Sequence, residues 1–381
     1  MRFAYVNHLP ANNLTLKFYS GIKQQIARKR TVSKPSAIPS ARNVGHDMAR
    51  AGVLAGDGIY AAIDLGTNNC RLLVARPSEE GFRVVDSFSR IVRLGEGVGA
   101  SGNNFTEDAM RRTIDALKVC ADKIRKNGVT HLRSVATAAC RCAKNADYFV
   151  DRVKKETGLQ LEIISAAEEA RLAIAGCVSL FEEESDYAFV FDIGGGSTEL
   201  IWATIDEPGK WDILEWTSIP YGVVNVAEEY GGGDVAPDQY QAMVAAMERC
   251  LAPFEARHKL TSYIKNGQVQ MVGTSGTVTT VAGIYLGLQR YDRNRVDGLW
   301  IDRDHITGIS QRLAAMPYAD RVAEPCIGRE RADLVVAGCA IWEAISNTWT
   351  CDRLRVADRG LREGMLLEQI AQSHLENKRY A

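Results

Sequence analysis

The sequence lacks the features that mark several large classes of protein. Its 381 residues contain no apolar run close to the roughly 20 residues of a membrane-spanning helix, so association with a membrane is not expected. The nine cysteines include no CxxC pair and the six histidines no HExxH spacing, which argues against a zinc site. Scattered cysteines in odd number favour unpaired thiols in a reducing compartment, and we expect a cytoplasmic protein.

A strong net charge is lacking too. The formal charge is −1, so affinity for a polyanion must come from local groups of Lys and Arg, and nucleic acid is not an expected partner. No Walker A element is present, and neither of the glycine segments that follow Asp64 and Asp192 completes GxGxxG, which argues against P-loop and dinucleotide-binding loops there. Residues 1–56 are the exception in charge, with nine Lys and Arg against the single acidic Asp47. Without an apolar period or a secretory signal, they predict a basic, flexible N-terminal tail.

From residue 57 onward, short apolar runs alternate with helical stretches, a pattern typical of α/β architecture. It predicts one α/β lobe over 57–176 and a second over 177–381. A helix is expected to begin after Ser165, which forms with Glu168 the S-x-x-E spacing of a capping box. That spacing gives Glu168 a structural role and leaves the adjacent Glu169 without one.

An internal repeat is the most informative feature. Residues 64–75 and 192–203 align without a gap, and each begins with an Asp that closes an apolar strand, followed by Gly and small polar residues. Glycine allows close approach and positive φ, so that backbone N–H groups can converge on a phosphate oxygen. Ordinary β-hairpins would use similar residues. Two matching copies favour duplicated phosphate-binding loops, in which the expected contacts are Gly66, Thr67, Asn68, Asn69, Gly194, Gly195, Gly196, Ser197 and Thr198.

A third glycine loop, at 272–280, lies between a predicted strand and a predicted helix. Its N–H groups and the helix N-terminus could face an anion, or the segment could be a simple turn.

Together these motifs resemble the exopolyphosphatase / guanosine pentaphosphate phosphatase (Ppx/GppA) family of the actin-like ATPase superfamily. The resemblance covers about residues 57–370 and includes EIISAAEEARLAIAG at 162–176, RLGEG at 93–97, ATAACR at 136–141, IGRERADLVVAG at 327–338 and DRGLREG at 358–364. It implies two actin-like (ribonuclease H-like) α/β lobes with an active-site cleft between them. Long members carry a further C-terminal helical domain with a His-Asp signature, so the sequence is most similar to a short-form exopolyphosphatase.

The resemblance also implies an activity and a site. A family member would hydrolyse the terminal phosphoanhydride of inorganic polyphosphate with Mg²⁺ or another divalent cation, and would form a homodimer. The family's catalytic glutamate matches Glu169, and its phosphate-binding arginine matches Arg141. Its metal carboxylates match Asp192 and Glu199, and Asp64 is a third candidate ligand. An ion pair between Glu199 and Arg71 is the alternative for that glutamate.

Other substrates remain open at this stage. Guanosine pentaphosphate is the main alternative substrate. A kinase or an actin-like ATPase of the same superfamily is a less favoured alternative for the class of protein. A strip of arginines would hold a long polyanion, with Arg93, Arg141, Arg295, Arg329, Arg331 and Arg359 as candidates. The alternative is that many of them pair with nearby carboxylates, among Asp292, Glu330, Asp333 and Asp358.

Overall fold

The computed structural model describes residues 58–79, 81–207 and 210–380, and the predicted tail at 1–56 lies outside them. The first sheet has five strands in the order β3-β2-β1-β4-β5. They are β1 (Tyr60–Leu65), β2 (Asn69–Ser78), β3 (Gly81–Ile91), β4 (His131–Ala136) and β5 (Glu162–Ile163). The helical elements of this half are α3 (Glu107–Lys126), α4 (Ala138–Cys142), α5 (Ala146–Thr157), α6 (Ala166–Cys177) and the 3₁₀ turn η2 (Val178–Leu180).

The second sheet repeats this order with one added edge strand, as β10-β11-β9-β6-β7-β8. Its strands are β6 (Tyr187–Ile193), β7 (Thr198–Glu207), β8 (Lys210–Ile219), β9 (Val269–Thr274), β10 (Trp300–Asp302) and β11 (Arg353–Ala357). The helices are α7 (Val223–Tyr230), α8 (Pro237–His258), α9 (Leu260–Lys265), α10 (Ser275–Tyr285), α11 (Arg293–Val296), α12 (Arg303–Ala315), α13 (Tyr318–Ala323), α14 (Val335–Thr348) and α15 (Leu361–Tyr380).

The repeat seen in the sequence is a repeat of structure. In each sheet three antiparallel strands are followed by parallel ones, and Asp64 lies opposite Arg71 as Asp192 lies opposite Glu199. The turns also match, because Gly66 N–H donates to Asn69 O and Gly194 N–H to Ser197 O, each at 2.9 Å. The two loops are therefore the same hairpin turn built twice.

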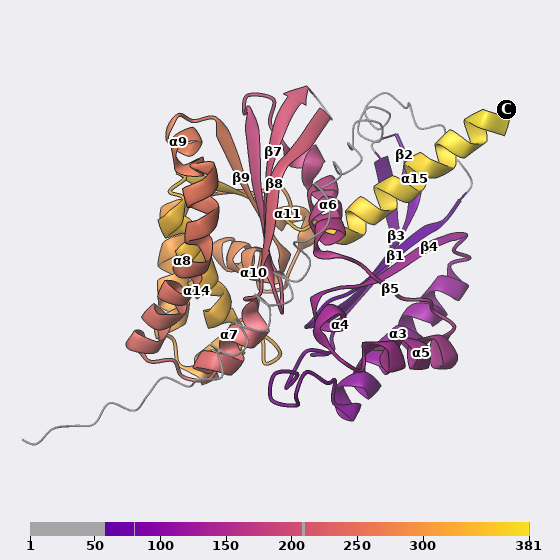
Figure 1. Ribbon diagram of the computed structural model, residues 1–381, viewed down its shortest axis with the longest axis horizontal. Coiled ribbons are helices and arrows are strands. Elements are labelled where there is room, and N and C mark those ends of the chain that lie inside the picture. The colour runs from indigo at the N-terminus through magenta and orange to yellow at the C-terminus, as the bar shows by residue number, and fades with distance from the viewer. Residues whose placement is uncertain (1–57, 80, 208–209, 381) are drawn as a thin grey trace, which may run out of the picture. The chain divides into compact units, whose positions relative to one another are not determined.

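Both sheets are buried on two faces, which explains why their central strands are almost wholly apolar. In β1, Ile63 faces the core formed with α3 and α5, whereas Ala62 faces α15. In β6, Phe189 and Phe191 face the core formed with α8 and α14, and Val190 faces α6. Figure 1 shows α3 and α5 beside the first sheet and α8 and α14 beside the second.

The helices α6 and α15 exchange partners between the two halves of the chain. Helix α6 packs on the second sheet, and α15, at the end of the chain, packs on the first. The boundaries 57–176 and 177–381 stay a prediction, and within them α6 and α15 each pack on the sheet of the other half. Local sequence patterns do not predict this exchange, because it depends on packing between residues that are far apart in the sequence.

The helix caps agree with local sequence signals. Thr106 Oγ1 accepts a hydrogen bond from Ala109 N–H at 3.2 Å, and Ser165 Oγ accepts one from Glu168 N–H at 3.1 Å. None of the nine cysteines, all within the described ranges, is in a disulfide. No helix in the described part of the chain combines the length and the apolar character that crossing a bilayer requires.

Candidate active site

The two repeated loops lie against each other. A Cβ atom added to Gly195 would be 3.0 Å from Thr67 Cβ and 3.1 Å from Asn68 Cβ, and one added to Gly196 would be 2.6 Å from Thr67 Oγ1. Glycine is thus needed for the close approach of the two loops. The predicted second reason, positive φ, is wrong here, because neither Gly195 nor Gly196 has a positive φ.

Several groups predicted to contact phosphate already form hydrogen bonds within the protein. The N–H groups of Gly66 and Gly194 close their own turns. Thr198 Oγ1 donates to Tyr221 O at 2.7 Å, and Ser197 Oγ donates to Glu199 Oε1 at 2.7 Å. These four residues shape the loops, so their predicted contacts with phosphate would need other atoms.

Other donors of the loops remain open to a ligand. The N–H groups of Thr67, Asn68, Gly195 and Gly196 have no acceptor within the described residues. In that same part of the chain, the buried Oδ1 atoms of Asn68 and Asn69 also have no partner. Buried polar atoms are costly when unpaired, so this surface is built for a polar ligand.

The third glycine loop contributes to the same cavity. Ser275 and Gly276, which open α10, line it together with Asn68, Asn69, Gly194, Gly195, Thr280 and Arg331. We call this cavity the cradle. Ser275 has φ +79°, a conformation that costs a non-glycine residue about 1–3 kcal/mol, and such strain tends to occur at functional sites. The N-terminus of α10 adds a partial positive charge.

Two aspartates close the central strands beside the cradle. Asp64 is the second-last residue of β1 and Asp192 that of β6, and burial raises the pKa of both, that of Asp192 to about 6. The positive charge of Arg71 opposes this rise at both carboxyls, and Ser275 donates a hydrogen bond to Asp192. Sequence reasoning missed this role of Arg71, although its position opposite Asp64 in the hairpin was a usable signal.

Glu199 lies in the second repeat and is 2% exposed. Its Oε1 accepts hydrogen bonds from Ser197 Oγ at 2.7 Å and Ser218 Oγ at 2.8 Å. Burial, followed by the negative charges of Glu169 and Asp192, raises its pKa well above the usual range. The alternative ion pair with Arg71 does not form in the described structure.

Glu169 lies in the first turn of α6, with Arg141 of α4 next to it. Arg141 Nη1 donates to Glu169 Oε2 at 2.6 Å and to Ile164 O at 3.1 Å. Burial raises the pKa of Glu169 to about 7, Arg141 lowers it, and the charges of Asp192 and Asp64 raise it further. A carboxyl that titrates near neutral pH suits a general base.

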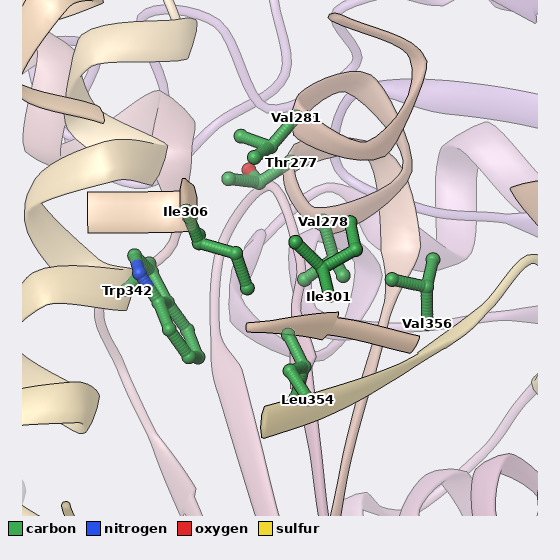
Figure 2. A pocket seen from close by; sticks show the side chains of 8 residues that line it. All are labelled: Thr277, Val278, Val281, Ile301, Ile306, Trp342, Leu354 and Val356. Atoms are coloured by element: carbon green, nitrogen blue, oxygen red, sulfur yellow. The ribbon is translucent and has the colours of Figure 1, made fainter. Parts of the chain in front are cut away.

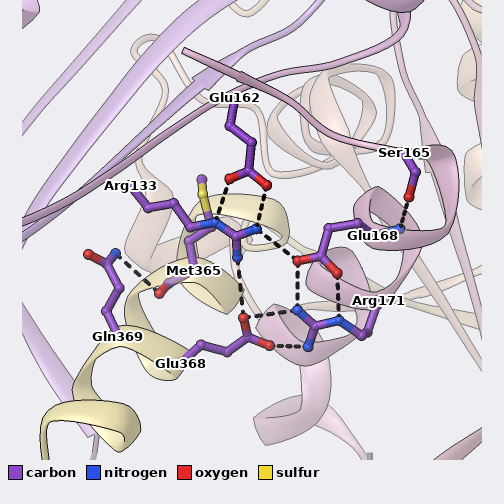
Figure 3. Close-up of polar contacts among 8 residues, drawn as sticks. All are labelled: Arg133, Glu162, Ser165, Glu168, Arg171, Met365, Glu368 and Gln369. Atoms are coloured by element: carbon purple, nitrogen blue, oxygen red, sulfur yellow. Dashed lines mark hydrogen bonds and ion pairs between the residues drawn. The ribbon is translucent and has the colours of Figure 1, made fainter. Parts of the chain in front are cut away.

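The neighbouring Glu168 points into a different set of contacts. Figure 3 shows its carboxylate between Arg133 and Arg171, with Glu368 of α15 on the other side of both arginines. The predicted structural role of Glu168 is therefore confirmed, but with other partners. Ser165 caps the helix, whereas Glu168 joins the first turn of α6 to β4 and α15 and does not complete a capping box.

The carboxylates also decide how a divalent cation could bind. In the part of the chain that the structure describes, no three His, Cys, Asp or Glu side chains are grouped closely enough to hold an ion together. Mg²⁺ needs only one or two carboxylates when waters and substrate phosphates complete its shell. The donor set therefore fits a cation shared with the substrate, and does not fit a cage in which Asp64, Asp192 and Glu199 all bind at once.

The arginines expected to form a strip are mostly engaged. Arg93 pairs with Asp333, Arg359 with Asp297 and Arg141 with Glu169. Arg331 differs: it donates to Thr280 Oγ1 at 3.1 Å and lines the cradle. Three of the six candidates are therefore in ion pairs, and Arg331 is the candidate that lies at the loops.

A second cavity, beneath α10, has a different character. Figure 2 shows its lining, which is apolar apart from the hydroxyl of Thr277 and the indole nitrogen of Trp342: Val278, Val281, Ile301, Ile306, Leu354 and Val356 complete it. Such a lining offers no charge to a phosphate. The cradle is therefore the cavity whose chemistry fits an anion.

The duplicated βββαβαβ core, with facing glycine loops and buried carboxylates, defines a two-lobed α/β protein with a polar cavity between its repeats. Residues 73–373 match the Ppx/GppA phosphatase family. The chain belongs to this family, and the predicted actin-like α/β fold is confirmed.

Known relatives agree with this assignment. A guanosine-5'-triphosphate,3'-diphosphate pyrophosphatase of Photobacterium profundum is 30% identical over 82% of this chain and 59% of its own length. The chain thus spans about three fifths of such curated relatives. A Ppx/GppA protein of Aquifex aeolicus is 28% identical with a TM-score of 0.68, over 83% of this chain and 98% of that one. An exopolyphosphatase of Cytophaga hutchinsonii is 25% identical with a TM-score of 0.74, over 82% and 98%.

Proposed function

We propose that this protein is an exopolyphosphatase, which releases orthophosphate from the end of inorganic polyphosphate by attack of water. The observation that carries the proposal is the placement of Glu169. Its carboxyl, with a pKa of about 7, lies among the charges of Asp64 and Asp192, beside loops whose N–H groups lack acceptors in the described structure. Phosphoryl transfer asks a protein mainly for positioning and for neutralising charge.

Each part of the site would serve one step. The open N–H groups of the two loops, with Ser275, Gly276 and Arg331, would bind the terminal phosphates. Glu169 would orient the attacking water and take its proton, and Arg141 would hold the carboxylate in place. A divalent cation bound at Asp64 or Asp192 would neutralise charge on the phosphate oxygens. Arg71, between these aspartates, would keep them ionised.

The metal proposal leads to a prediction for Asp192→Asn. This change removes a charged oxygen ligand from a hard cation, so we expect half-maximal activity to need at least about tenfold more Mg²⁺. The measurement is a Mg²⁺ titration of the initial rate. Asp186→Asn, at the end of a surface loop, is the matched control. An unchanged Mg²⁺ requirement in Asp192→Asn would show that this aspartate is not a ligand.

The pH dependence of kcat should report the ionisation of Glu169. Because the base must be deprotonated to accept a proton, kcat is expected to rise with pH through about 7 and to fall as pH is lowered below it. Arg141 lowers the pKa of Glu169, so Arg141→Gln should move the rising part of the kcat–pH profile to higher pH. If kcat rose over the same pH range in the variant as in the wild type, the result would argue against Glu169 as the titrating group.

The direct test of the function is a phosphate-release assay. Tripolyphosphate, long-chain polyphosphate and guanosine pentaphosphate are compared without ATP. Release from polyphosphate supports the proposal, and release from guanosine pentaphosphate alone supports the second candidate, which the similarity to the Photobacterium profundum pyrophosphatase favours. A strict requirement for ATP would point to a kinase or an actin-like ATPase.

A further inference from the structure

A second polar cavity adjoins the cradle. It shares Asn68 and Leu334 with the cradle, and its charged lining consists of Arg93, Glu96, Glu228 and Asp333. We call it the outer pocket. Because two residues line both cavities, a substrate too long for the cradle would extend into this space.

The charge of the outer pocket is unfavourable for phosphate. One arginine faces three carboxylates, and that arginine is already committed. Arg93 Nη1 donates to Asp333 Oδ2 at 2.7 Å and Arg93 Nη2 to Asp333 Oδ1 at 2.8 Å, a bidentate pair. Glu96 is paired with Arg112 at 2.8 Å, whereas Glu228 is in no ion pair of the described residues. A phosphate unit entering here would have to break the Arg93–Asp333 pair or lie beside the charge of Glu228.

Hydrogen bonds join the two halves of the chain at the outer pocket. Gly97 N–H of the first half donates to Glu228 Oε1 of α7 at 2.8 Å, and Arg93 Nη2 donates to Glu330 O at 3.1 Å. The backbone of Arg93 has φ +49°, and its N–H donates to Asn68 O at 3.0 Å. The arginine is therefore anchored on the first phosphate loop itself.

Resting on the proposed function, we propose that Asp333 and Glu228 set the substrate length: they exclude long chains and favour short oligophosphates whose charges end within the cradle. Polyphosphate carries about one negative charge per unit, so each added unit meets repulsion here, less screened at Asp333, whose side chain is 28% exposed, than at the exposed Glu228. Asp333 acts by cancelling the charge of Arg93, the one cation among the described residues that line the pocket.

The test compares kcat/KM for tripolyphosphate and for long-chain polyphosphate in Asp333→Asn and Glu228→Gln. Removing one charge and freeing Arg93 should raise the long-to-short ratio about tenfold in Asp333→Asn. Glu228→Gln should raise it less. Arg93→Gln breaks the same pair but removes the cation, so the ratio should not rise. Glu229→Gln, which removes the same charge from the next residue of α7, is the control and should leave the ratio unchanged.

Turnover of tripolyphosphate shows in each variant that the protein is folded. A long-to-short ratio that stays unchanged in both active variants would overturn the inference and leave the proposed function intact. A wild-type protein that already prefers long chains would overturn it as well. Failure to release phosphate from any polyphosphate would instead overturn the proposed function, and the inference with it.

Discussion

Glu169→Gln is expected to lower kcat by about 10²–10⁴-fold, because the amide cannot accept the proton of the attacking water. Substrate binding should change little, since in the proposed function the loops and not this side chain hold the phosphates. Loss in kcat with an almost constant dissociation constant is the signature of a group that acts only in the transition state. Single-turnover rates and equilibrium binding of polyphosphate would measure the two quantities separately.

The matched control is Glu168→Gln, the same change one residue earlier. Its carboxylate binds Arg133 and Arg171 and faces away from the Arg141 contact, so its effect should be mainly on stability. Because Glu168 helps to fix the first turn of α6, a small decrease in kcat is consistent with its place. Equal losses of kcat in both variants would refute the assignment of Glu169 as the base.

Gly176→Ala is expected to destabilise the folded protein by about 3 kcal/mol or more, because its methyl group has no space. A Cβ atom at Gly176 would lie 2.0 Å from Gly360 O, and that oxygen belongs to backbone, which cannot rotate away. The contact lies where α6 approaches the start of α15. The expected result is a much lower midpoint of urea unfolding.

A second glycine supplies the control for this prediction. Gly308 lies in helix α12, and a Cβ atom there would meet nothing within 4 Å. Gly308→Ala should therefore raise stability by up to about 1 kcal/mol through helix propensity. If both substitutions gave the same change, the close approach of α6 to the α15 segment would not be what requires glycine at position 176.

Local patterns predicted much of the fold and the centre of the site. The apolar runs that end at Asp64 and Asp192 are strands, and both polar segments after them are turns. The distinction between Glu168 and Glu169 also follows from a local signal, the spacing from Ser165. These features are encoded by neighbours in the sequence, because caps, turns and strand periodicity depend on contacts across a few residues.

Particular side chains of the loops show where such reasoning fails. Thr198 and Ser197 have the composition of phosphate donors, yet their hydroxyls are used by Tyr221 O and Glu199. For Thr198 the choice depends on the segment that follows β8, and for Ser197 on the orientation of Glu199, two residues away. Sequence composition cannot separate a hydroxyl that faces the ligand from one that faces the adjacent strand.

The sequence by itself determined the duplicated loops, the alternation of strands and helices from residue 57 onward, and the identity of the candidate base. Tertiary structure decided the rest: the exchange of α6 and α15, the place of Arg71 between two aspartates, and the pairing of Arg93 with Asp333, 240 residues away. The physical reason is the distance along the sequence over which each kind of interaction acts. A local element is selected by interactions among adjacent residues, whereas the partner of a charge is selected by the packing that brings distant segments together.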